Sequence, residues 1–166
     1  MQFKECNWEY LISKNLVARF GTFDYDPATN AEQAKALGIP NYSTIFTDGL
    51  KQDWTKFKRI WINPPTYLIF PFLEKAVYTY QKVHNDIYFL APDSILTKKK
   101  FHETIADVGV KLYIPNGRIK FRRLHQEEEE PPSFNSIIFK FQSENAVRFF
   151  DIITPGGHYI LNETDV

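Results

Sequence analysis

The sequence predicts an α/β protein whose mainly parallel sheet is closed by an antiparallel hairpin. Up to about residue 108, short apolar runs alternate with helical patterns, which is typical of parallel strands joined by helices. From residue 110 onward, strand-like runs follow one another with no helical pattern between them. The run IYFLAP at 87–92 is continuously apolar, as expected of a strand buried on both faces. Since 166 residues suit one domain, we expect a single domain over residues 1–166.

The first part of the chain is expected to alternate helices and strands, because apolar residues recur there with helical spacing between short β-branched runs. Residues that typically cap or end helices support several of the helix boundaries. In order, we expect a helix over 8–20 ended by Gly21, a strand and turn over 23–30, a helix over 31–37 between Asn30 and Gly38, a strand over 43–50, a strand over 59–62, a helix over 71–83, a strand over 87–92, and a helix over 98–108 capped by Thr97.

The second part is expected to be strand on strand, with strands over 110–115, 118–121, 136–141 and 146–153. Between them, HQEEEEPPS at 125–133 is highly charged and rich in proline, so we expect a mobile loop there.

Composition excludes several classes of protein. Lys+Arg and Asp+Glu both number 20, so a strongly basic surface for non-specific nucleic-acid binding is not expected, although a local basic patch remains compatible. The single cysteine excludes an intramolecular disulfide and a cysteine-based zinc site. No apolar run reaches ~18 residues and no signal peptide begins the sequence. The four histidines are scattered, so we expect no metal site. From the apolar runs and the N-terminal stretch, we expect no membrane segment and a cytoplasmic location.

Polar side chains follow three of the expected strands. Asp24, Asp26 and Asn30 follow the first, Asp48 ends the second, and Asn63 ends the third. Because ligands gather at the carboxyl ends of parallel strands, these residues are candidates for binding a ribose, an amine or a positive group. Each aspartate alone has an alternative, structural role, since Asp and Asn favour turns through their own hydrogen bonds.

The stretch RIWINPPTY at 59–67 is more specific. The proline after Asn63 holds that residue extended, and neither Pro64 nor Pro65 carries a backbone N–H. The Asn63 amide oxygen and the Pro64 carbonyl therefore present two acceptors in fixed geometry. Such a pair suits an exocyclic amine, because accepting both of its hydrogens makes the nitrogen lone pair available as a nucleophile. An aromatic neighbour such as Tyr67 could stack on the ring that carries the amine.

These residues resemble the phage-type DNA N6-adenine methyltransferases, a family of class I S-adenosylmethionine-dependent methyltransferases. The family shows an Asp-x-Asp-x-Ala strand, an Asp-Gly-Leu element, a Trp, and then Asn-Pro-Pro-Tyr. This chain shows, in the same order, FDYDPATNAEQAKALGIP, TDGLKQDW and RIWINPPTY, followed by NGRIKF at 116–121 and PPSFNSIIFKF at 131–141. The resemblance covers residues 8–141. It departs from the motif at Thr66, where the family has an aromatic, with Tyr67 one position later.

The resemblance implies a Rossmann-like methyltransferase sheet, S-adenosylmethionine as cofactor, and methylation of N6 of adenine in DNA. It also implies a phage- or prophage-encoded protein in a bacterial host cell. Carried over by position, the cofactor site would comprise Trp8, Tyr10, Asp24, Asp26, Ala28, Asn30 and Asp48. The amine site would comprise Asn63, Pro64, Pro65 and Tyr67.

DNA contacts are expected from two basic segments. The first comprises Lys98, Lys99 and Lys100; the second comprises Arg118, Lys120, Arg122 and Arg123. Strand alternation would direct Arg118, Lys120 and Arg122 to one side and Ile119, Phe121 and Arg123 to the other, which predicts a basic face above an apolar one. A solvated surface strand is an equally weighted alternative for the second segment. A second copy in a homodimer could supply further DNA contacts. Because Thr66 stands where the family motif has an aromatic, one alternative is a catalytically silent protein that binds cofactor, DNA or a host protein. Another alternative is an Asn-Pro-Pro enzyme that acts on amines in RNA or protein.

Overall fold

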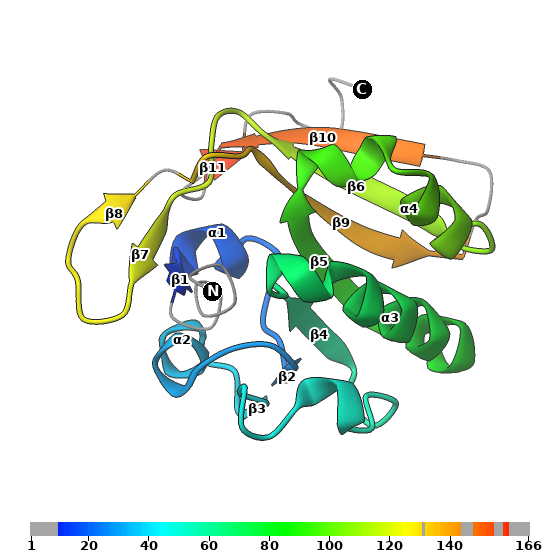
Figure 1. Ribbon diagram of the computed structural model, residues 1–166, viewed down its shortest axis with the longest axis horizontal. Helices are drawn as coiled ribbons and strands as arrows, with labels where there is room; N and C mark the ends of the chain where they lie inside the picture. The colour runs from blue at the N-terminus through cyan, green and yellow to red at the C-terminus, as the bar shows by residue number, and fades with distance from the viewer. Residues whose placement is uncertain (1–9, 131, 144–147, 155–157, 160–166) are drawn as a thin grey trace.

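The computed structural model describes residues 10–130, 132–143, 148–154, 158 and 159. Its frame is an eight-stranded sheet with helices on both faces (Figure 1). The strands, in spatial order, are β11 (His158–Tyr159), β10 (Arg148–Thr154), β6 (Gly109–Pro115), β9 (Ser136–Gln142), β5 (Asp86–Pro92), β4 (Arg59–Ile62), β2 (Tyr25–Asp26) and β3 (Asn41–Tyr42). A small second sheet has the order β1 (Tyr10–Ile12), β7 (Phe121–Arg123) and β8 (Glu129–Glu130).

The large sheet is mainly parallel, which confirms the predicted fold class. Strands β3, β2, β4 and β5 run parallel to one another, as do β6 and β10. Antiparallel pairing, as expected, occurs at one edge of the sheet, between β10 and β11, and also inside the sheet, where β9 lies antiparallel between β5 and β6. Ile137, Ile138, Phe139 and Phe141 of β9 are each no more than 3% exposed, so this strand needs cover on both faces.

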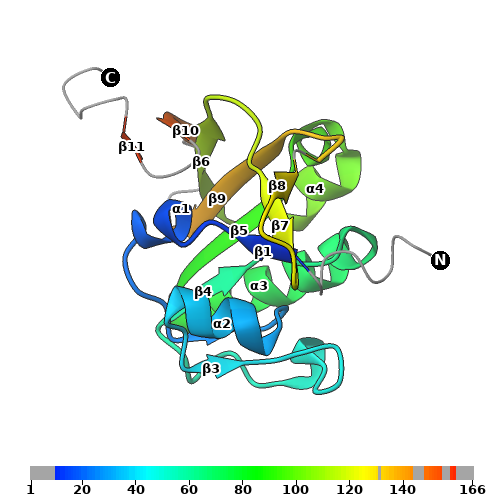
Figure 2. The same cartoon turned by 90° about the vertical axis from the view of Figure 1, so that its left-hand side faces the viewer.

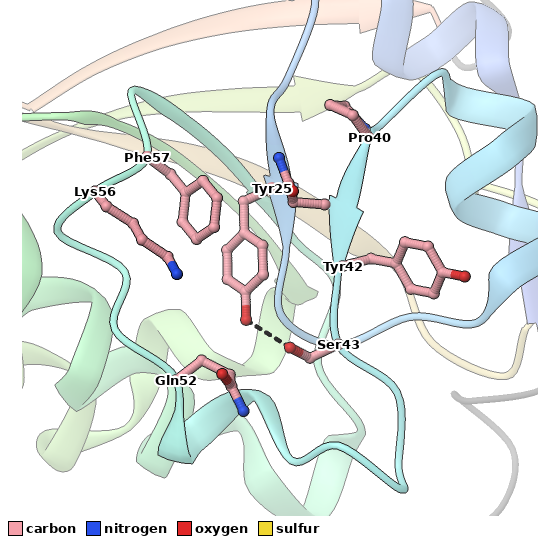
Figure 3. A pocket seen from close by; sticks show the side chains of 8 residues that line it. Tyr25, Pro40, Tyr42, Ser43, Gln52, Lys56 and Phe57 are labelled. Atoms are coloured by element: carbon pink, nitrogen blue, oxygen red, sulfur yellow. Dashed lines mark hydrogen bonds between the residues drawn. The ribbon is translucent and has the colours of Figure 1, made fainter.

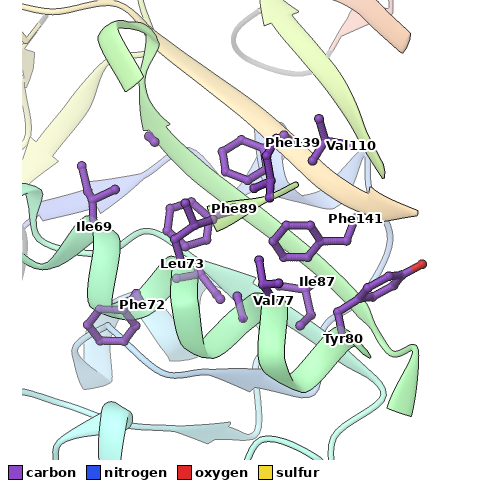
Figure 4. Close-up of a cluster of buried hydrophobic side chains, with 14 of the residues drawn as sticks. Ile69, Phe72, Leu73, Val77, Tyr80, Ile87, Phe89, Val110, Phe139 and Phe141 are labelled. Carbon is purple, nitrogen blue, oxygen red and sulfur yellow. The ribbon is translucent and has the colours of Figure 1, made fainter. Parts of the chain in front are cut away.

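Two hydrophobic cores lie on the two faces of the sheet. Helices α3 (Ile69–Val83) and α4 (Lys99–Thr104) cover the first core, where Phe89, Phe139 and Phe141 pack together (Figure 4). The second core lies under α1 (Lys14–Ala18), with Ile39 from the segment after α2 (Ala31–Leu37), and it joins Leu16 to Trp61. We call the side of the sheet that holds the second core the α1 face, and Figure 2 shows α1 and α3 on opposite sides.

The first predicted helix is wrong over part of its length. Of residues 10–20, only Lys14–Ala18 are helical; Tyr10–Ile12 form β1 and pair with Arg123–Phe121 of β7. Residues 8 and 9 of the predicted helix lie outside the described residues. Leu11 and Ile12 are both buried, and the residues of β1 pair with β7 in the small second sheet. Pairing with a strand over a hundred residues away therefore determined the local structure.

The predicted strand over 43–50 is also wrong, because β3 ends at Tyr42. Residues 44–47 form a turn in which Thr44 N–H donates to Thr47 Oγ1 (2.8 Å) and Thr47 N–H donates to the Thr44 carbonyl (3.1 Å). Threonine hydroxyls that bond the nearby backbone compete with strand pairing. The 3-10 turn η3 (Gly49–Lys51) follows at once.

The predicted helices after these turns are correct to different extents. Helix α2 has the predicted bounds, with the Asn30 side chain accepting from Gln33 N–H (2.8 Å) and Gly38 left-handed at its end. Helix α3 begins at Ile69, two residues earlier than expected. Helix α4 is shorter than predicted, and the Thr97 hydroxyl does not cap it but donates to the Ser94 carbonyl within the 3-10 turn η5 (Asp93–Thr97).

The arm between β6 and β9 forms a hairpin that projects from the body of the molecule (Figure 1). Its regular strand β7 lies at Phe121–Arg123, three residues later than the predicted 118–121. Burial nevertheless alternates as expected: Ile119 and Phe121 are buried, whereas Arg118 and Lys120 are exposed. Within the predicted loop 125–133, the structure places β8, which pairs with β7.

Candidate active site at the carboxyl edge of the sheet

Asp26 and Asn63 lie close together at the carboxyl edge of the sheet. Tyr25 pairs with Ile60, so Asp26 is level with Trp61, and Asn63 lies two residues further along the neighbouring strand. One strand spacing and two residues of rise separate their Cα atoms by about 8 Å. Tyr25 packs in the first core and Trp61 in the second, so strand alternation directs both Asp26 and Asn63 to the α1 face.

Asp26 is a buried carboxyl without a basic partner in the described part of the chain. It is 1% exposed, its Oδ1 accepts from Ala28 N–H (2.9 Å), and the Thr29 side chain also bonds to it. Burial raises the pKa of Asp26 to about 7, while its bonds to Ala28 and Thr29 oppose that rise. The site can therefore stabilise a positive group, which would return the carboxyl to its charged form.

The turn after β2 is packed tightly against the Asp-Gly-Leu segment. A Cβ on Gly49 would lie 1.9 Å from the Pro27 carbonyl oxygen, so only glycine allows the two segments to approach so closely. Asp48 has a φ of 49°, its Oδ1 accepts from Leu50 N–H (3.2 Å), and its carboxylate lies 3.6 Å from Lys51 Nζ. Asp48 is thereby held beside the turn that carries Ala28 and Asn30.

Asp24 lies at the other end of β2. Its carboxylate accepts from the backbone N–H groups of Lys58 (3.0 Å) and Arg59 (2.7 Å) at the start of β4. The amino end of a parallel strand is the opposite edge of the sheet from Asn63. The structure therefore does not bring Asp24 together with Asp26, and its hydrogen bonds tie β2 to β4.

The Asn63-Pro64-Pro65 segment leaves β4 in a defined shape. Both prolines are buried, Asn63 is half-buried, and Leu68 N–H donates to the Pro65 carbonyl (2.9 Å) to begin the 3-10 turn η4 (Thr66–Leu68). The Asn63 carboxamide makes no hydrogen bond to any other residue that the structure describes. Its acceptor oxygen is therefore available to a ligand.

The expected aromatic partner is less well placed. Thr66 is exposed, and the Tyr67 side chain is 46% exposed within η4. The structure thus holds Tyr67 next to the Asn-Pro-Pro segment without burying its ring against the body of the protein.

A pocket of about 300 Å³ is lined by Tyr25, Ser43 and Phe57, among other residues (Figure 3). Tyr25 packs in the first core, so this pocket lies on the opposite face of the sheet from Asp26. Tyr25 hydroxyl and Ser43 Oγ lie 2.6 Å apart in its wall, and the Tyr25 ring stacks on Phe57 with a centroid distance of 4.2 Å. Burial raises the pKa of Tyr25 to about 12. None of the residues predicted to bind cofactor lines this pocket, so we assign no ligand to it.

The predicted N-terminal cover of the cofactor is only partly described, since Trp8 lies outside the described residues. Tyr10, in β1, accepts a hydrogen bond from Arg123 Nε (3.0 Å) and packs edge-on against Phe121 at 6.3 Å. This residue is therefore tied to the hairpin arm, and both belong to the α1 face.

The two groups of predicted DNA-binding cations lie on different faces of the sheet. Lys98, Lys99 and Lys100 lead into α4 on the first-core side, where Lys99 and Lys100 lie near Glu103 (3.4 Å) and Glu74 (3.7 Å). On the arm, Arg118 donates to Asn135 and to the Pro132 carbonyl. Arg122 donates to the Gln126 carbonyl (2.6 Å) and lies 3.6 Å from Glu32. Lys120 is exposed.

The roles of Thr29 and Gly49 at this site were not predicted from the sequence. Thr29 supplies a side-chain hydrogen bond to Asp26, and its backbone N–H donates to the Ser43 carbonyl (3.0 Å), which joins the turn to β3. The signal in the sequence was present: a hydroxyl three residues after a strand-end aspartate suits a turn that bonds its own carboxylate.

Among the residues described, no cluster of three or more His, Cys, Asp or Glu side chains could hold a metal ion. In the same part of the chain, the helices are too short or too polar to cross a membrane.

Comparison with known proteins places the site in a family. The family described as DNA N-6-adenine-methyltransferase (Dam) matches residues 8–148. No curated protein matches the sequence. Two solved structures are similar to this chain. One is a Listeria monocytogenes protein described as a class I S-adenosylmethionine-dependent methyltransferase, with 14% identity, a TM-score of 0.43, and a match that covers 84% of this chain and 53% of that one. The other is an Agrobacterium tumefaciens protein described as an O-methyltransferase, with 11% identity, a TM-score of 0.41, and a match that covers 81% of this chain and 65% of that one. The chain thus spans 53% and 65% of the lengths of these two proteins. Because the family match extends over most of the sequence and includes Asp26 and Asn63, the chain belongs to the DNA N-6-adenine-methyltransferase (Dam) family.

Proposed function

We propose that the protein transfers a methyl group from S-adenosylmethionine to N6 of adenine in DNA. The observation that carries this proposal is the position of Asn63 at the end of β4, where its Cα lies about 8 Å from the Cα of the buried Asp26. Membership of the Dam family supports the choice of DNA and of adenine.

Asn63 and Pro64 would bind the amine. Their two oxygens accept the two N6 hydrogens and draw the nitrogen lone pair out of conjugation with the ring. As the new C–N bond forms and the methyl–sulfur bond breaks, N6 becomes positively charged, and the same two acceptors stabilise that charge. The extra N6 proton then leaves to solvent. No covalent intermediate with the protein is needed, so catalysis depends on orientation and polarisation.

The residues beside the amine site fit the cofactor. When bound, S-adenosylmethionine supplies an electrophilic methyl group on a positive sulfonium and also carries a positive amino group. Asp26 is a buried acceptor without a basic partner among the described residues, which suits such a cation. Ala28 and Asn30 would shape the pocket wall, Asp48 would face the adenine end, and Trp8 and Tyr10 would cover it.

DNA would be held by the hairpin arm on the α1 face, with Lys120 its most available cation. The segment Lys98–Lys100 could reach DNA only beyond the other face, or in a homodimer. We also propose, from the family resemblance, that the protein is phage- or prophage-encoded and acts in the cytoplasm of a bacterial host.

The direct test is nucleoside mass spectrometry of DNA, RNA and protein hydrolysates from a methylation-deficient host that expresses the protein. We expect N6-methyladenine in DNA and no new methylated amine in RNA or protein. A methylated amine found only in RNA or protein would contradict the choice of substrate.

A second candidate function is supported by Thr66, which is exposed where the family motif has an aromatic ring. In that case the protein binds cofactor or DNA without transferring methyl groups. Calorimetric binding of S-adenosylmethionine by purified protein that leaves host DNA unmethylated would favour this alternative.

A further inference from the structure

Lys75 is a half-buried lysine of α3 whose ammonium group binds the backbone of η3. Its Nζ donates to the Leu50 carbonyl (2.7 Å) and lies 5.4 Å from the centroid of the Trp54 ring. Burial lowers the pKa of Lys75, while the charges of Asp53 and Asp48 oppose that decrease. Lysine side chains usually keep the ammonium group in water, whereas this one is directed into a contact between two elements.

The carbonyl that Lys75 binds lies at the end of a short turn. Within η3, the carbonyls of Asp48 and Gly49 accept from backbone N–H groups three residues further along (3.0 and 3.2 Å). The turn ends one residue after Leu50, and carbonyls at the end of a helical turn need donors from elsewhere. Lys75 supplies such a donor from a different element.

Of the two elements that this bond joins, α3 is the more firmly held. Its apolar stripe faces the first core (Figure 4), and its buried residues are Ile69, Phe72, Leu73, Ala76, Val77, Thr79 and Tyr80. By contrast, η3 has three residues, of which Gly49 is buried. The Lys75 bond therefore acts from a fixed helix on a short turn, so its loss would displace η3 and leave α3 in place.

The bond also connects the two halves of the proposed active site. Helix α3 begins at Ile69, directly after η4 and the Asn-Pro-Pro segment that carries Asn63. At the other end of the connection, Leu50 N–H donates to Oδ1 of Asp48, which we propose faces the adenine end of the cofactor. Leu50 is thus bonded through its N–H to Asp48 and through its carbonyl to Lys75.

We propose that Lys75 is a positioning residue for cofactor binding: by holding the Leu50 carbonyl, it fixes Asp48 relative to the helix that extends from the amine site. This inference rests on the proposed function and goes beyond it, since it gives a role to a residue of the opposite face from Asp26. Lys75 acts through η3, while Asp48 supplies the contact to the cofactor.

The test compares Lys75→Met with Lys75→Arg by calorimetric titration with S-adenosylmethionine. Methionine keeps an unbranched stem but has no donor, so we expect Lys75→Met to weaken binding about tenfold, the loss expected of one hydrogen bond from a charged donor. Lys75→Arg keeps charged donors and should remain within about threefold of wild type. The KM for the cofactor should rise with the dissociation constant, while kcat at saturating cofactor stays near the wild-type value, because Asn63 is held by its own prolines.

Lys82→Met is the matched control. Lys82 is an exposed lysine of the same helix, and its Nζ lies 5.7 Å from the centroid of the Tyr78 ring. This variant should bind the cofactor as wild type does. Urea unfolding of each variant measures the effect on the fold separately. A Lys75→Met protein that loses stability but keeps wild-type affinity, or equal losses of affinity in Lys75→Met and Lys82→Met, would overturn the positioning role.

A double-variant cycle tests the route through Asp48. Asp48→Asn keeps an Oδ1 acceptor for Leu50 N–H but removes the charge, so it should weaken binding by itself. If Lys75 acts through Asp48, the double variant should lose little more affinity than the weaker-binding single variant. Fully additive losses would overturn this route. Absence of S-adenosylmethionine binding by wild type would reject the proposed function itself, whereas wild type that binds the cofactor but leaves DNA unmethylated would reject only the reaction.

Discussion

Asp26 is the residue whose physical state matters most for the site. A carboxyl that is 1% exposed and has no basic partner among the described residues is easier to bury as the neutral acid, so its pKa rises to about 7. Near neutral pH the group is thus poised between its two forms. A bound cation would favour the carboxylate, and this links both folding and cofactor binding to protons.

Stability without cofactor should fall as the pH rises. The folded pKa of Asp26 is about 7 and the reference value is 3.8, so its stabilising protonated form is fully present below about pH 4 and is lost as the pH rises through 7. Between these limits we expect Asp26 to remove up to about 1.4 kcal/mol of unfolding free energy per pH unit. Urea unfolding of wild type and Asp26→Asn from pH 4.5 to 7.5 measures this; parallel profiles for the two proteins would contradict it.

Cofactor affinity should show the opposite dependence. If the positive cofactor binds the carboxylate form of Asp26, affinity should rise up to tenfold per pH unit below pH 7 and level off above it. Asp26→Asn should bind weakly at every pH. Asp24→Asn is the control, because Asp24 bonds the backbone of β4 and should keep the slope. Titration calorimetry across this range checks it, and a pH-independent wild-type affinity would exclude the assignment of Asp26.

At the scale of single residues, the sequence predicted the Asp26–Asn63 pair because polar groups at the carboxyl ends of parallel strands share one edge. It did not separate Asp24 from Asp26, since Asp24 directly precedes the two-residue strand β2 and Asp26 is its last residue. Only the register with β4 shows that Asp24 binds Lys58 and Arg59 at the opposite edge. The hydrogen bonds that Arg118 donates to Asn135 and to the Pro132 carbonyl could not be predicted either, because they join segments fourteen or more residues apart.

Among the elements, the contact between η3 and the turn after β2 determines the shape of the part of the site that we propose binds the cofactor. Gly49 lies against the Pro27 backbone, and the Trp54 indole N–H donates to the Gly49 carbonyl (2.8 Å). Two motifs that are about twenty residues apart in the sequence thus form one packed unit, which explains why glycine occupies that position.

Gly49→Ala should therefore destabilise the protein by about 2–3 kcal/mol, because the added methyl would overlap the Pro27 carbonyl and force the backbone apart. Gly38→Ala is the matched comparison. Its added methyl meets open space, and only the left-handed φ of 68° costs about 1 kcal/mol. Urea denaturation followed by tryptophan fluorescence measures both, and an equal loss in the two variants would show that the contact is not tight.

The elements that the sequence predicted well are those with local signals. Helix α2 has an asparagine cap and a glycine stop, and α3 has a complete apolar stripe. The elements that were wrong depend on distant partners: β1 needs β7 to form, and β3 ends where threonine hydroxyls close a turn. Periodicity over a few residues cannot distinguish these outcomes.

For the whole molecule, β9 joins the two halves of the large sheet. It pairs with β5 on one side and β6 on the other, and its residues contribute to both cores. The sequence predicted a mainly parallel sheet with an antiparallel part, but the interior position of β9 follows from pairings with β5 and β6 between residues 25 to 52 positions apart in the sequence.

Phe139 is the residue of β9 that best measures this role. It is 0% exposed and packs against Phe89, Phe101 and Phe141, so Phe139→Ala should lower the free energy of unfolding by about 3–5 kcal/mol. Phe46→Ala removes a phenyl ring that is 94% exposed, and it should change the free energy of unfolding by less than about 0.5 kcal/mol. Chemical denaturation of the pair checks the prediction, and similar losses would contradict the described core.

The central claim, that Asn63 holds the target amine of adenine in DNA, is tested most directly by comparing wild type, Asn63→Ala and Asn63→Asp in a methylation-deficient host. N6-methyladenine in DNA is measured by nucleoside mass spectrometry, and S-adenosylmethionine binding by calorimetry on the purified proteins. We predict methyladenine from wild type, a reduced but measurable amount from Asn63→Asp, which keeps an acceptor oxygen, and none from Asn63→Ala, with cofactor binding retained in all three. Near-normal methylation by folded Asn63→Ala would contradict the account.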